Sequence, residues 1–363
     1  MTDKKELKIT QSASKIKTAD SCSFKYWASY ILRLPDKSNS GAKVGSVSHL
    51  ILECLAEPRR RKLAEKIVKQ QDLFKGKPCQ GIKKLVYKHA HHLDIADDEN
   101  IKKIQTFVVN GLSHDFWGEK RGKPVKSLTE KDFDILKEGR YKIRGFIDRL
   151  FIYKDGHALI RDYKSSKECY KGDEATTLND QATMYCLAVR ELFPEVKTVS
   201  VEFLFLKFDC DIESEWATGQ YQGRETKKLY HNGGGLITLN YDWGEVEGFE
   251  DYLEGFQEYL EDFTEEDATK NFAAVKPEPS DGSFGGKLSC GFGRVPGQLK
   301  KDGSVMWSCS YRHPFLYYHV TQGEKFIATC FLDEREKLIH KYPVEEFTWT
   351  EKSYLGCPFW YKQ

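Results

Sequence analysis

Residues 141–165 read YKIRGFIDRLFIYKDGHALIRDYKS. Two runs rich in β-branched and aromatic residues flank the dipeptide Asp155-Gly156, which is typical of a tight turn, so this stretch predicts a β-hairpin. The two strands of a hairpin pair antiparallel, and this pairing brings Asp148 on the first strand near Asp162 on the second. The sequence therefore predicts a sheet that carries two neighbouring carboxylates.

The second strand of this hairpin ends in the triplet Asp162-Tyr163-Lys164. Side chains alternate between the two faces of a strand, so Asp162 and Lys164 point to one face and Tyr163 to the other. Hard divalent cations prefer oxygen ligands, which Asp148, Asp162 and the main-chain carbonyl of Tyr163 can supply. Lys164 would orient or deprotonate a water beside the metal. An acidic-x-Lys triplet alone is weak evidence, because 31% of the chain is charged and Glu195-Val196-Lys197 has the same spacing.

A helix is predicted over residues 43–57, because the apolar residues Val47, Leu50, Ile51 and Leu55 recur at helical spacing. Gly45 lies one turn before His49 and Glu53 lies one turn after it, so His49 and Glu53 share one face of the helix. By itself, a histidine on a half-buried helix is usually a hydrogen-bonded packing residue.

A second helix is predicted over residues 178–192, with Asn179 or Asp180 as its N-cap. This helix places Gln181 and Tyr185 one turn apart on the same face. Without further context such residues are an ordinary surface pair.

Four motifs follow one another along the chain: Gly45-x-x-x-His49, Gly145-Phe146-Ile147-Asp148, Asp162-Tyr163-Lys164 and Gln181-x-x-x-Tyr185. This combination resembles the RecB-like branch of the PD-(D/E)xK nuclease superfamily. Residues 12–34, SASKIKTADSCSFKYWASYILRL, also resemble that branch, which commonly begins with a short helix, a cysteine and an aromatic-rich helix. The resemblance covers residues 10–210 well and the remainder loosely.

The resemblance implies an α/β fold with a restriction-endonuclease-like core, in which helices flank a mixed central sheet. We expect residues 1–210 to form this nuclease core, with a helical insertion at about 58–125. Residues 211–363 would be a C-terminal extension that completes the core. In this extension, residues 246–266 predict an acidic helix with one apolar stripe, and residues 274–304 predict an extended loop.

The resemblance further implies a metal-dependent DNA nuclease, in the first place an exonuclease of DNA recombination, repair or degradation. Such an enzyme hydrolyses phosphodiesters with a metal-activated water, and its cofactor would be Mg²⁺ or Mn²⁺. The residues transferred from the family are the metal ligands His49, Asp148, Asp162 and the Tyr163 carbonyl, the catalytic residues Lys164, Asp162 and Asp148, and the DNA-positioning residues Gln181 and Tyr185.

Three alternative functions remain open: a nuclease on RNA, a structure-specific endonuclease, and a non-enzymatic DNA-binding module on an inactive nuclease fold. The binding module is expected to lack a ligand or the lysine, and this sequence retains all of them. No nucleotide-hydrolysis motif is visible, because Gly282–Leu288 has the wrong spacing and no Ser or Thr directly after Lys287. A helicase or recombination protein that acts with this nuclease would therefore be a separate chain.

The composition adds expectations about partners and location. Lys+Arg total 56 against 55 Asp+Glu, so DNA would bind through local basic patches rather than net charge. The candidate patches are Arg59-Arg60-Arg61-Lys62, Lys83-Lys84 with Lys88, and Lys120-Arg121 with Lys123. No apolar run is long enough to cross a bilayer, and the first residues lack the apolar segment of a signal peptide. We therefore expect no membrane partner and a cytoplasmic, intracellular location, with which a phage origin is compatible.

Ten cysteines in a reducing compartment argue against structural disulfides. Several RecB-like nucleases hold an iron–sulfur cluster with one cysteine ahead of the Gly-x-x-x-His helix and three near the C-terminus. That resemblance makes Cys22, Cys290, Cys309 and Cys357 candidate ligands of a [4Fe–4S] cluster.

The cysteine spacing nevertheless departs from the family. Its tight C-terminal spacing is absent, and Arg312 stands where the next cysteine would be. A zinc site that uses His313 or His319 is a second alternative. The departure favours a third alternative, in which no metal joins these segments.

Overall fold

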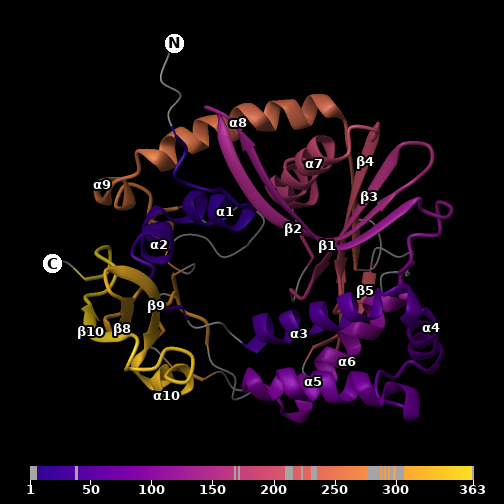
Figure 1. Ribbon diagram of the computed structural model, residues 1–363, viewed down its shortest axis with the longest axis horizontal. Coiled ribbons are helices and arrows are strands. Elements are labelled where there is room, and N and C mark those ends of the chain that lie inside the picture. The colour runs from indigo at the N-terminus through magenta and orange to yellow at the C-terminus, as the bar shows by residue number, and fades with distance from the viewer. Residues whose placement is uncertain are drawn as a thin grey trace. The chain divides into compact units, whose positions relative to one another are not determined.

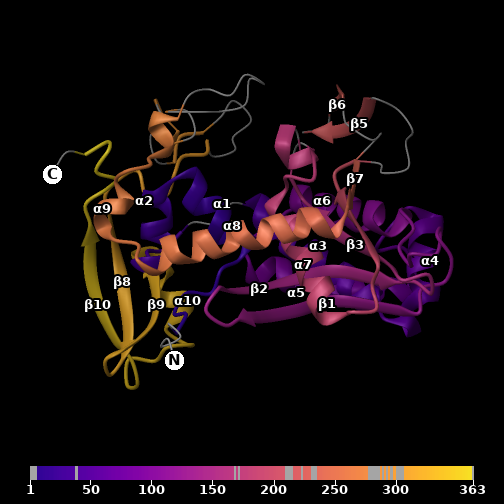
Figure 2. The same ribbon diagram turned by 90° about the horizontal axis from the view of Figure 1, so that it is seen from above.

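The computed structural model, shown in Figures 1 and 2, describes residues 6–36, 40–166, 169–170, 172–208, 216–221, 224–229, 235–276, 287, 290–291, 293–294, 297–299 and 306–361. The chain divides into two compact units. Unit 1 contains Met1–Ala13 and Ser38–Gln257, and unit 2 contains Ser14–Lys37 and Glu258–Gln363. Each unit is thus assembled from segments that are distant in the sequence.

A five-stranded mixed sheet forms the centre of unit 1 (Figure 1). Its strands lie in the order β1 (Lys126–Lys137), β2 (Tyr141–Ile152), β3 (His157–Lys164), β4 (Thr198–Phe205) and β7 (Leu236–Tyr241). All neighbours pair antiparallel except β3 and β4, which are parallel. The predicted hairpin is confirmed as β2 and β3, and the mixed sheet with flanking helices confirms the predicted fold class.

Helices cover both faces of this sheet. One face meets a helical layer of α3 (Ser40–Leu55), α4 (Arg61–Gln70), α5 (Gln80–His92) and α6 (Asp98–Ser113), whose buried apolar residues pack with Tyr163, Leu204 and Leu206 of the sheet region. The other face meets α7 (Asp180–Leu192), which forms the crossover between β3 and β4 (Figure 1). Three short 3₁₀ turns, Pro58–Arg60, Lys77–Cys79 and Gly172–Ala175, connect these elements.

Buried polar contacts fix strand β3 at Arg161, the residue that precedes Asp162 in the sequence. Arg161 is fully buried, and its guanidinium donates to Glu202 Oε2 at 2.7 and 2.9 Å and to the carbonyl of Asp115 at 2.7 Å. Because Glu202 lies on the neighbouring strand β4, this contact ties β3 to β4 and to the end of the helical layer.

The remaining elements of unit 1 follow β4. Strands β5 (Trp216–Tyr221) and β6 (Arg224–Leu229) form a separate two-stranded sheet. Helix α8 (Trp243–Glu261) overlaps the acidic helix expected at 246–266; its residues up to Gln257 belong to unit 1, where Gln257 hydrogen-bonds Gln11 at 2.7 Å. Most of the predicted loop at 274–304 lies outside the described residues.

Unit 2 joins an N-terminal helical segment to the C-terminal part of the chain. The helical segment contains α1 (Ala13–Ser21), α2 (Ser23–Tyr26) and a π-helical turn at Trp27–Ile31. A three-stranded antiparallel sheet has the order β10 (Thr348–Tyr354), β8 (Phe315–Gln322) and β9 (Lys325–Phe331), as Figure 2 shows. Short helices complete the unit: α9 (Glu265–Ala268), α10 (Arg335–Leu338) and 3₁₀ turns at Ala273–Val275 and Leu332–Glu334. Its core gathers Cys22, Phe24, Tyr311, Tyr317, Tyr354 and Cys357.

Candidate active site

The hairpin brings the two predicted carboxylates together. Arg149 pairs with Arg161, so the next position in the register places Asp148 on β2 opposite Asp162 on β3. Asp148 Oδ2 accepts a hydrogen bond from the backbone N–H of Tyr163 at 2.7 Å. Asp162 is buried, with 3% of its surface exposed, so its charge needs a partner inside the protein.

That partner is Lys164, whose Nζ lies 2.6 Å from Asp162 Oδ2. The contact confirms that Asp162 and Lys164 point to the same face of β3. Burial alone would lower the pKa of Lys164, but the Asp162 carboxylate raises the pKa well above the usual range of lysine. Lys164 is therefore a protonated cation near neutral pH, and this favours the orienting role over the deprotonating one.

Gln181 and Tyr185 complete a hydrogen-bonded network around Asp162. Asn179 caps α7 by accepting from the N–H of Ala182, and this start of the helix directs both side chains toward β3. Asp162 Oδ1 accepts from Gln181 Nε2 at 3.1 Å and from the Tyr185 hydroxyl at 3.0 Å, while Gln181 Oε1 accepts from Lys164 Nζ at 2.7 Å. The predicted role of Gln181 and Tyr185 in DNA contact stays a prediction.

His49 reaches the carboxylates from the other side, on α3. Its Nδ1 lies 3.5 Å from Asp148 Oδ1, and its ring meets the ring of Tyr163 edge-on at 5.9 Å. Gly45 explains how α3 comes so close, because a Cβ at that position would lie 2.5 Å from the hydroxyl oxygen of Ser165. Burial lowers the pKa of His49, but the Asp148 carboxylate and its hydrogen bond outweigh this and raise the pKa to about 9.

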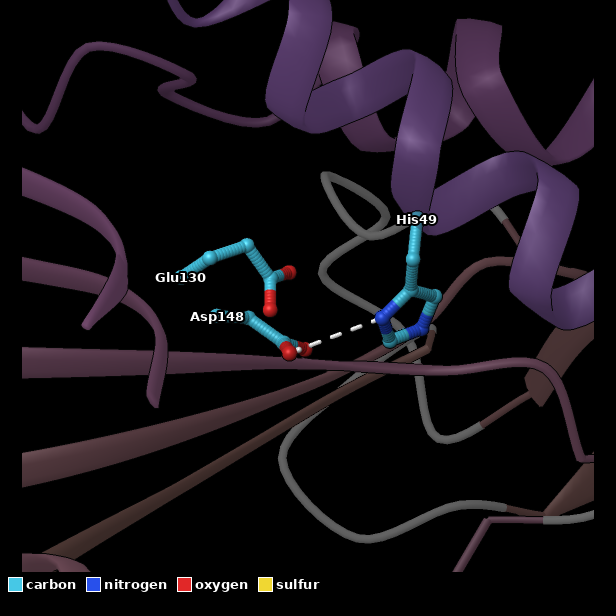
Figure 3. Close-up of side chains that lie close together, drawn as sticks. All are labelled: His49, Glu130 and Asp148. Atoms are coloured by element: carbon cyan, nitrogen blue, oxygen red, sulfur yellow. Dashed lines mark ion pairs between the residues drawn. The ribbon is translucent and has the colours of Figure 1, made fainter. Parts of the chain in front are cut away.

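Glu130 on β1 is a site residue that the sequence analysis missed. His49, Glu130 and Asp148 each offer one ligand atom, and these atoms all lie within 4.8 Å of one another. Figure 3 shows the three side chains converging from α3, β1 and β2. The missed signal was the pairing of β1 with β2, because Thr129 pairs with Arg149 and Lys131 with Ile147, which sets Glu130 opposite Asp148.

This donor set fits a divalent cation. One imidazole and two carboxylates are ligands that Mn²⁺ and Mg²⁺ accept in proteins, and imidazole favours the softer Mn²⁺. The Tyr163 carbonyl, which was predicted as a further ligand, has no described contact that tests this role.

A family model for the PD-(D/E)XK nuclease superfamily matches residues 10–292 of the chain. The chain belongs to the PD-(D/E)XK nuclease superfamily. Members of this superfamily are metal-dependent nucleases, so membership implies a nucleic-acid substrate. Among the described residues of the nuclease, no helix combines the length and apolarity needed to span a membrane.

Two solved structures are similar to parts of this nuclease. A chain designated a candidate exonuclease from Eubacterium rectale is 10% identical, with 69% of this chain and 80% of that chain covered, at a TM-score of 0.36. The protein SSO0001 is 13% identical, with 48% and 68% covered, at a TM-score of 0.23. TM-scores and identities this low support no conclusion about function. No protein of curated function matches the chain.

The four candidate cluster cysteines of the nuclease lie together in unit 2. Cys22, Cys290, Cys309 and Cys357 all line one pocket, although they are up to 335 residues apart in the sequence. The rest of the lining is mostly apolar or aromatic, with Lys25 and Arg312 as its charged members. No disulfide joins these cysteines. The structure therefore gathers four thiols that the spacing in the sequence had made doubtful as a set.

The spacing of these thiols bears on which metal fits them. No three of their sulfur atoms lie within 4.8 Å of one another. Zinc bound tetrahedrally at ~2.3 Å would hold its sulfur ligands ~3.8 Å apart.

Burial and the neighbouring thiols raise the pKa of Cys309 to about 11 and that of Cys357 to about 12. Bound metal would reverse this effect, because a coordinating thiol is deprotonated.

Arg312 and His313 are engaged in other contacts. The guanidinium of Arg312 stacks over the ring of Trp360 at 4.5 Å, and its backbone carbonyl accepts from the N–H of Cys357 at 3.3 Å. His313 hydrogen-bonds the hydroxyl of Tyr361 at 2.6 Å, and neither His313 nor His319 lines the pocket.

Proposed function

We propose that this protein is a RecB-like DNA exonuclease that uses Mg²⁺ or Mn²⁺ and acts in DNA recombination, repair or degradation. The single observation that carries the proposal is the network in which Asp162 contacts Lys164, Gln181 and Tyr185 while Asp148 contacts His49. These contacts join all four family motifs in one place, and a chance assembly of unrelated motifs would not do so.

Each residue has a defined task in phosphodiester hydrolysis. A divalent ion bound by the carboxylates and the imidazole supplies Lewis acidity toward the phosphate and an acidified water. Lys164 is a fixed cation that orients the attacking water and stabilises negative charge as it develops on the phosphate oxygens. Gln181 and Tyr185 hold the Asp162 carboxylate by its Oδ1, so its Oδ2 stays directed toward Lys164.

Cleavage assays test the class of nuclease. Purified protein with Mg²⁺ or Mn²⁺ is given end-labelled linear DNA, covalently closed circular DNA, single-stranded DNA and RNA of matched sequence, with Asp162→Ala as the inactive control. We expect release of short products from linear DNA ends and no cleavage of the closed circle. Equal cleavage of circular DNA would indicate an endonuclease, and cleavage of RNA alone would indicate a ribonuclease. If no substrate is cleaved with either metal, the non-enzymatic DNA-binding module would be the remaining alternative.

We also propose that Cys22, Cys290, Cys309 and Cys357 hold a [4Fe–4S] cluster. Four thiols in one pocket meet the ligand requirement of such a cluster. In a cluster each thiolate binds a different iron, so all four cysteines of the pocket would be used. A clasp of this kind would tie the N-terminal helices of unit 2 to its C-terminal segments.

Anaerobic purification tests the cluster. We expect brown protein with broad absorbance near 400 nm and about four irons per chain, both lost in Cys22→Ser and Cys309→Ser. Cys330→Ser is the matched control, because Cys330 is also buried in unit 2 but does not line the pocket. Zinc in place of iron would indicate the second alternative. Colourless protein without iron or zinc that still cleaves DNA would eliminate the cluster.

A further inference from the structure

One face of β2 is exposed directly ahead of Asp148. Ile143 and Ile147 are fully buried. Arg144 and Phe146 alternate with them and point to the opposite face, where both are exposed. Phe146 is 50% exposed, and no other phenylalanine in the described parts of the chain is as exposed. The ring therefore offers an aromatic face to a ligand.

The cation beside this ring is not engaged elsewhere. The guanidinium of Arg144 lies over the ring of Phe146, 6.0 Å from the ring centroid. Within the described parts of the chain, the Arg144 side chain forms no hydrogen bond or ion pair. Its backbone is fixed, because the N–H of Arg144 donates to the carbonyl of Gln11 at 2.9 Å. Arg144 thus presents an unpaired positive charge from a well-held strand.

The neighbouring strand restricts where an anion can lie. Phe146 pairs with Asp132 of β1. Arg144 pairs with Asp134, and both aspartates are exposed. Asp132 contacts its own cation, Lys131, at 3.4 Å. Because carboxylates repel a phosphate, an anion on this face is directed away from β1 and toward Arg144. The uncharged part of the same ligand is left to the ring.

This exposed face is continuous with the candidate active site. Phe146 precedes Asp148 by two residues, which is ~6.6 Å along a strand. On the buried side, a Cβ at Gly145 would lie 2.5 Å from the ring of Phe133. That ring meets the ring of Tyr185 edge-on at 6.3 Å, and Tyr185 belongs to the hydrogen-bonded network of the site. The ring of Phe146 is therefore carried by backbone that packs directly on the active-site residues.

We propose that Phe146 and Arg144 form a subsite for one unpaired nucleobase and its phosphate, next to the nucleotide held at Asp148. The base stacks on the ring of Phe146, and the guanidinium of Arg144 pairs with the phosphate. Inside a duplex both faces of a base are covered by its neighbours, so the subsite accepts an unpaired or terminal base. Every base has a π-face, so the subsite reads no sequence. The proposal rests on the proposed nuclease function, because a strand must lie at Asp148 for its next nucleotide to reach Phe146.

Fluorescence anisotropy tests the ring, with a labelled single-stranded oligonucleotide and a blunt duplex of the same sequence, in chelator so that neither is cleaved. Phe146→Ala should raise the Kd for the single strand ~5- to ~150-fold and change the Kd for the duplex less than ~3-fold. Phe146→Leu keeps apolar bulk without a ring and should also weaken binding, whereas Phe146→Trp should stay within ~3-fold of wild type.

Leu136→Ala is the matched control for these variants. Leu136 is 55% exposed on β1 and pairs with Lys142, six residues before Asp148, which is ~20 Å along the strand. Its variant should bind the single strand as wild type does. Arg144→Gln tests the cation, because loss of one phosphate contact should reduce the slope of log Kd against log salt concentration by ~0.7.

An abasic scan separates stacking from a merely structural role. The oligonucleotide is made with one base removed, at a position that is moved along the strand. In the wild-type protein, one abasic position should weaken binding about as much as Phe146→Ala does. In Phe146→Ala, the same abasic position should cause no further loss, because the two changes remove the same contact.

Three results would overturn the subsite: wild-type Kd for the single strand in both Phe146→Ala and Phe146→Leu, an equal loss on the blunt duplex, or no abasic position coupled to Phe146. A wild-type protein that cleaves DNA while these results hold would leave the nuclease function standing without the subsite. A wild-type protein that cleaves no nucleic acid in Mg²⁺ or Mn²⁺ but binds single strands through Phe146 would refute the nuclease function and support the subsite.

Discussion

Mn²⁺ affinity should rise with pH, because the metal ion and a proton compete for the imidazole of His49. Burial lowers the pKa of this imidazole, but the Asp148 carboxylate, with Asp162 and Glu130 behind it, raises the pKa to about 9 in the metal-free protein. At pH 7 only about 1 imidazole in 100 is then neutral and able to bind a cation.

The size of the effect follows from that pKa. Between pH 7 and pH 8 the neutral fraction of His49 rises about tenfold, so the apparent Kd for Mn²⁺ should fall about tenfold, or about 1.4 kcal/mol. Below pH 7 the dependence should steepen, because burial and the Asp148 charge raise the pKa of Glu130 to about 7. Two protons must then leave for each ion bound.

Calorimetric titrations at pH 6, 7 and 8, in two buffers with different ionisation enthalpies, measure both Kd and the number of protons released. We expect about one proton per Mn²⁺ at pH 8 and about two at pH 6. His49→Asn should bind Mn²⁺ more weakly and lose the tenfold change between pH 7 and pH 8. A wild-type Kd that stays constant over this range, with no proton released, would refute the reasoning that His49 is a ligand.

Three further predictions concern the other site residues. Lys164→Ala should lower kcat by ~100-fold or more and change Mn²⁺ affinity little, since it removes the cation that stabilises developing charge. Single-turnover cleavage measures the loss of rate, and calorimetry measures the Mn²⁺ affinity. Tyr185→Phe removes one of the two hydrogen bonds to Asp162 Oδ1, so kcat should fall ~10-fold with a smaller change in KM. A large rise in KM with little change in kcat would instead indicate that Tyr185 contacts DNA. Gly45→Ala places a Cβ 2.5 Å from a serine oxygen and should destabilise the protein by ~1–3 kcal/mol in urea unfolding, whereas Gly81→Ala, with nothing within 4 Å, should not destabilise it.

Local patterns in the sequence were enough to predict the elements that carry most of the site. The hairpin of β2 and β3 follows from two β-rich runs around Asp155-Gly156, and a tight turn sets the register that places Asp148 opposite Asp162. Helices α3 and α7 follow from apolar spacing and from the cap at Asn179. These features depend on neighbours within about one helical turn or one hairpin, so they are legible without the fold.

The position of Glu130 could be decided only by the tertiary structure. The pairing of β1 with β2 sets it opposite Asp148, and its left-handed backbone aims the carboxylate at His49 on a helix more than 70 residues earlier. A charged residue among other charged residues of a strand has no sequence pattern around it that indicates such a role.

The four cysteines show the same limit over a longer range. Each is an isolated small residue in the sequence, and their spacing argued against a shared site. The packing of α2 against the C-terminal sheet of unit 2 nonetheless brings Cys22 into one pocket with Cys290, Cys309 and Cys357. Local patterns in the sequence therefore determined the helices and strands of this nuclease and its central carboxylate pair. Contacts between distant segments decided which other side chains meet at its two candidate metal sites. Such contacts join residues up to hundreds of positions apart, so no local periodicity in the sequence reports them.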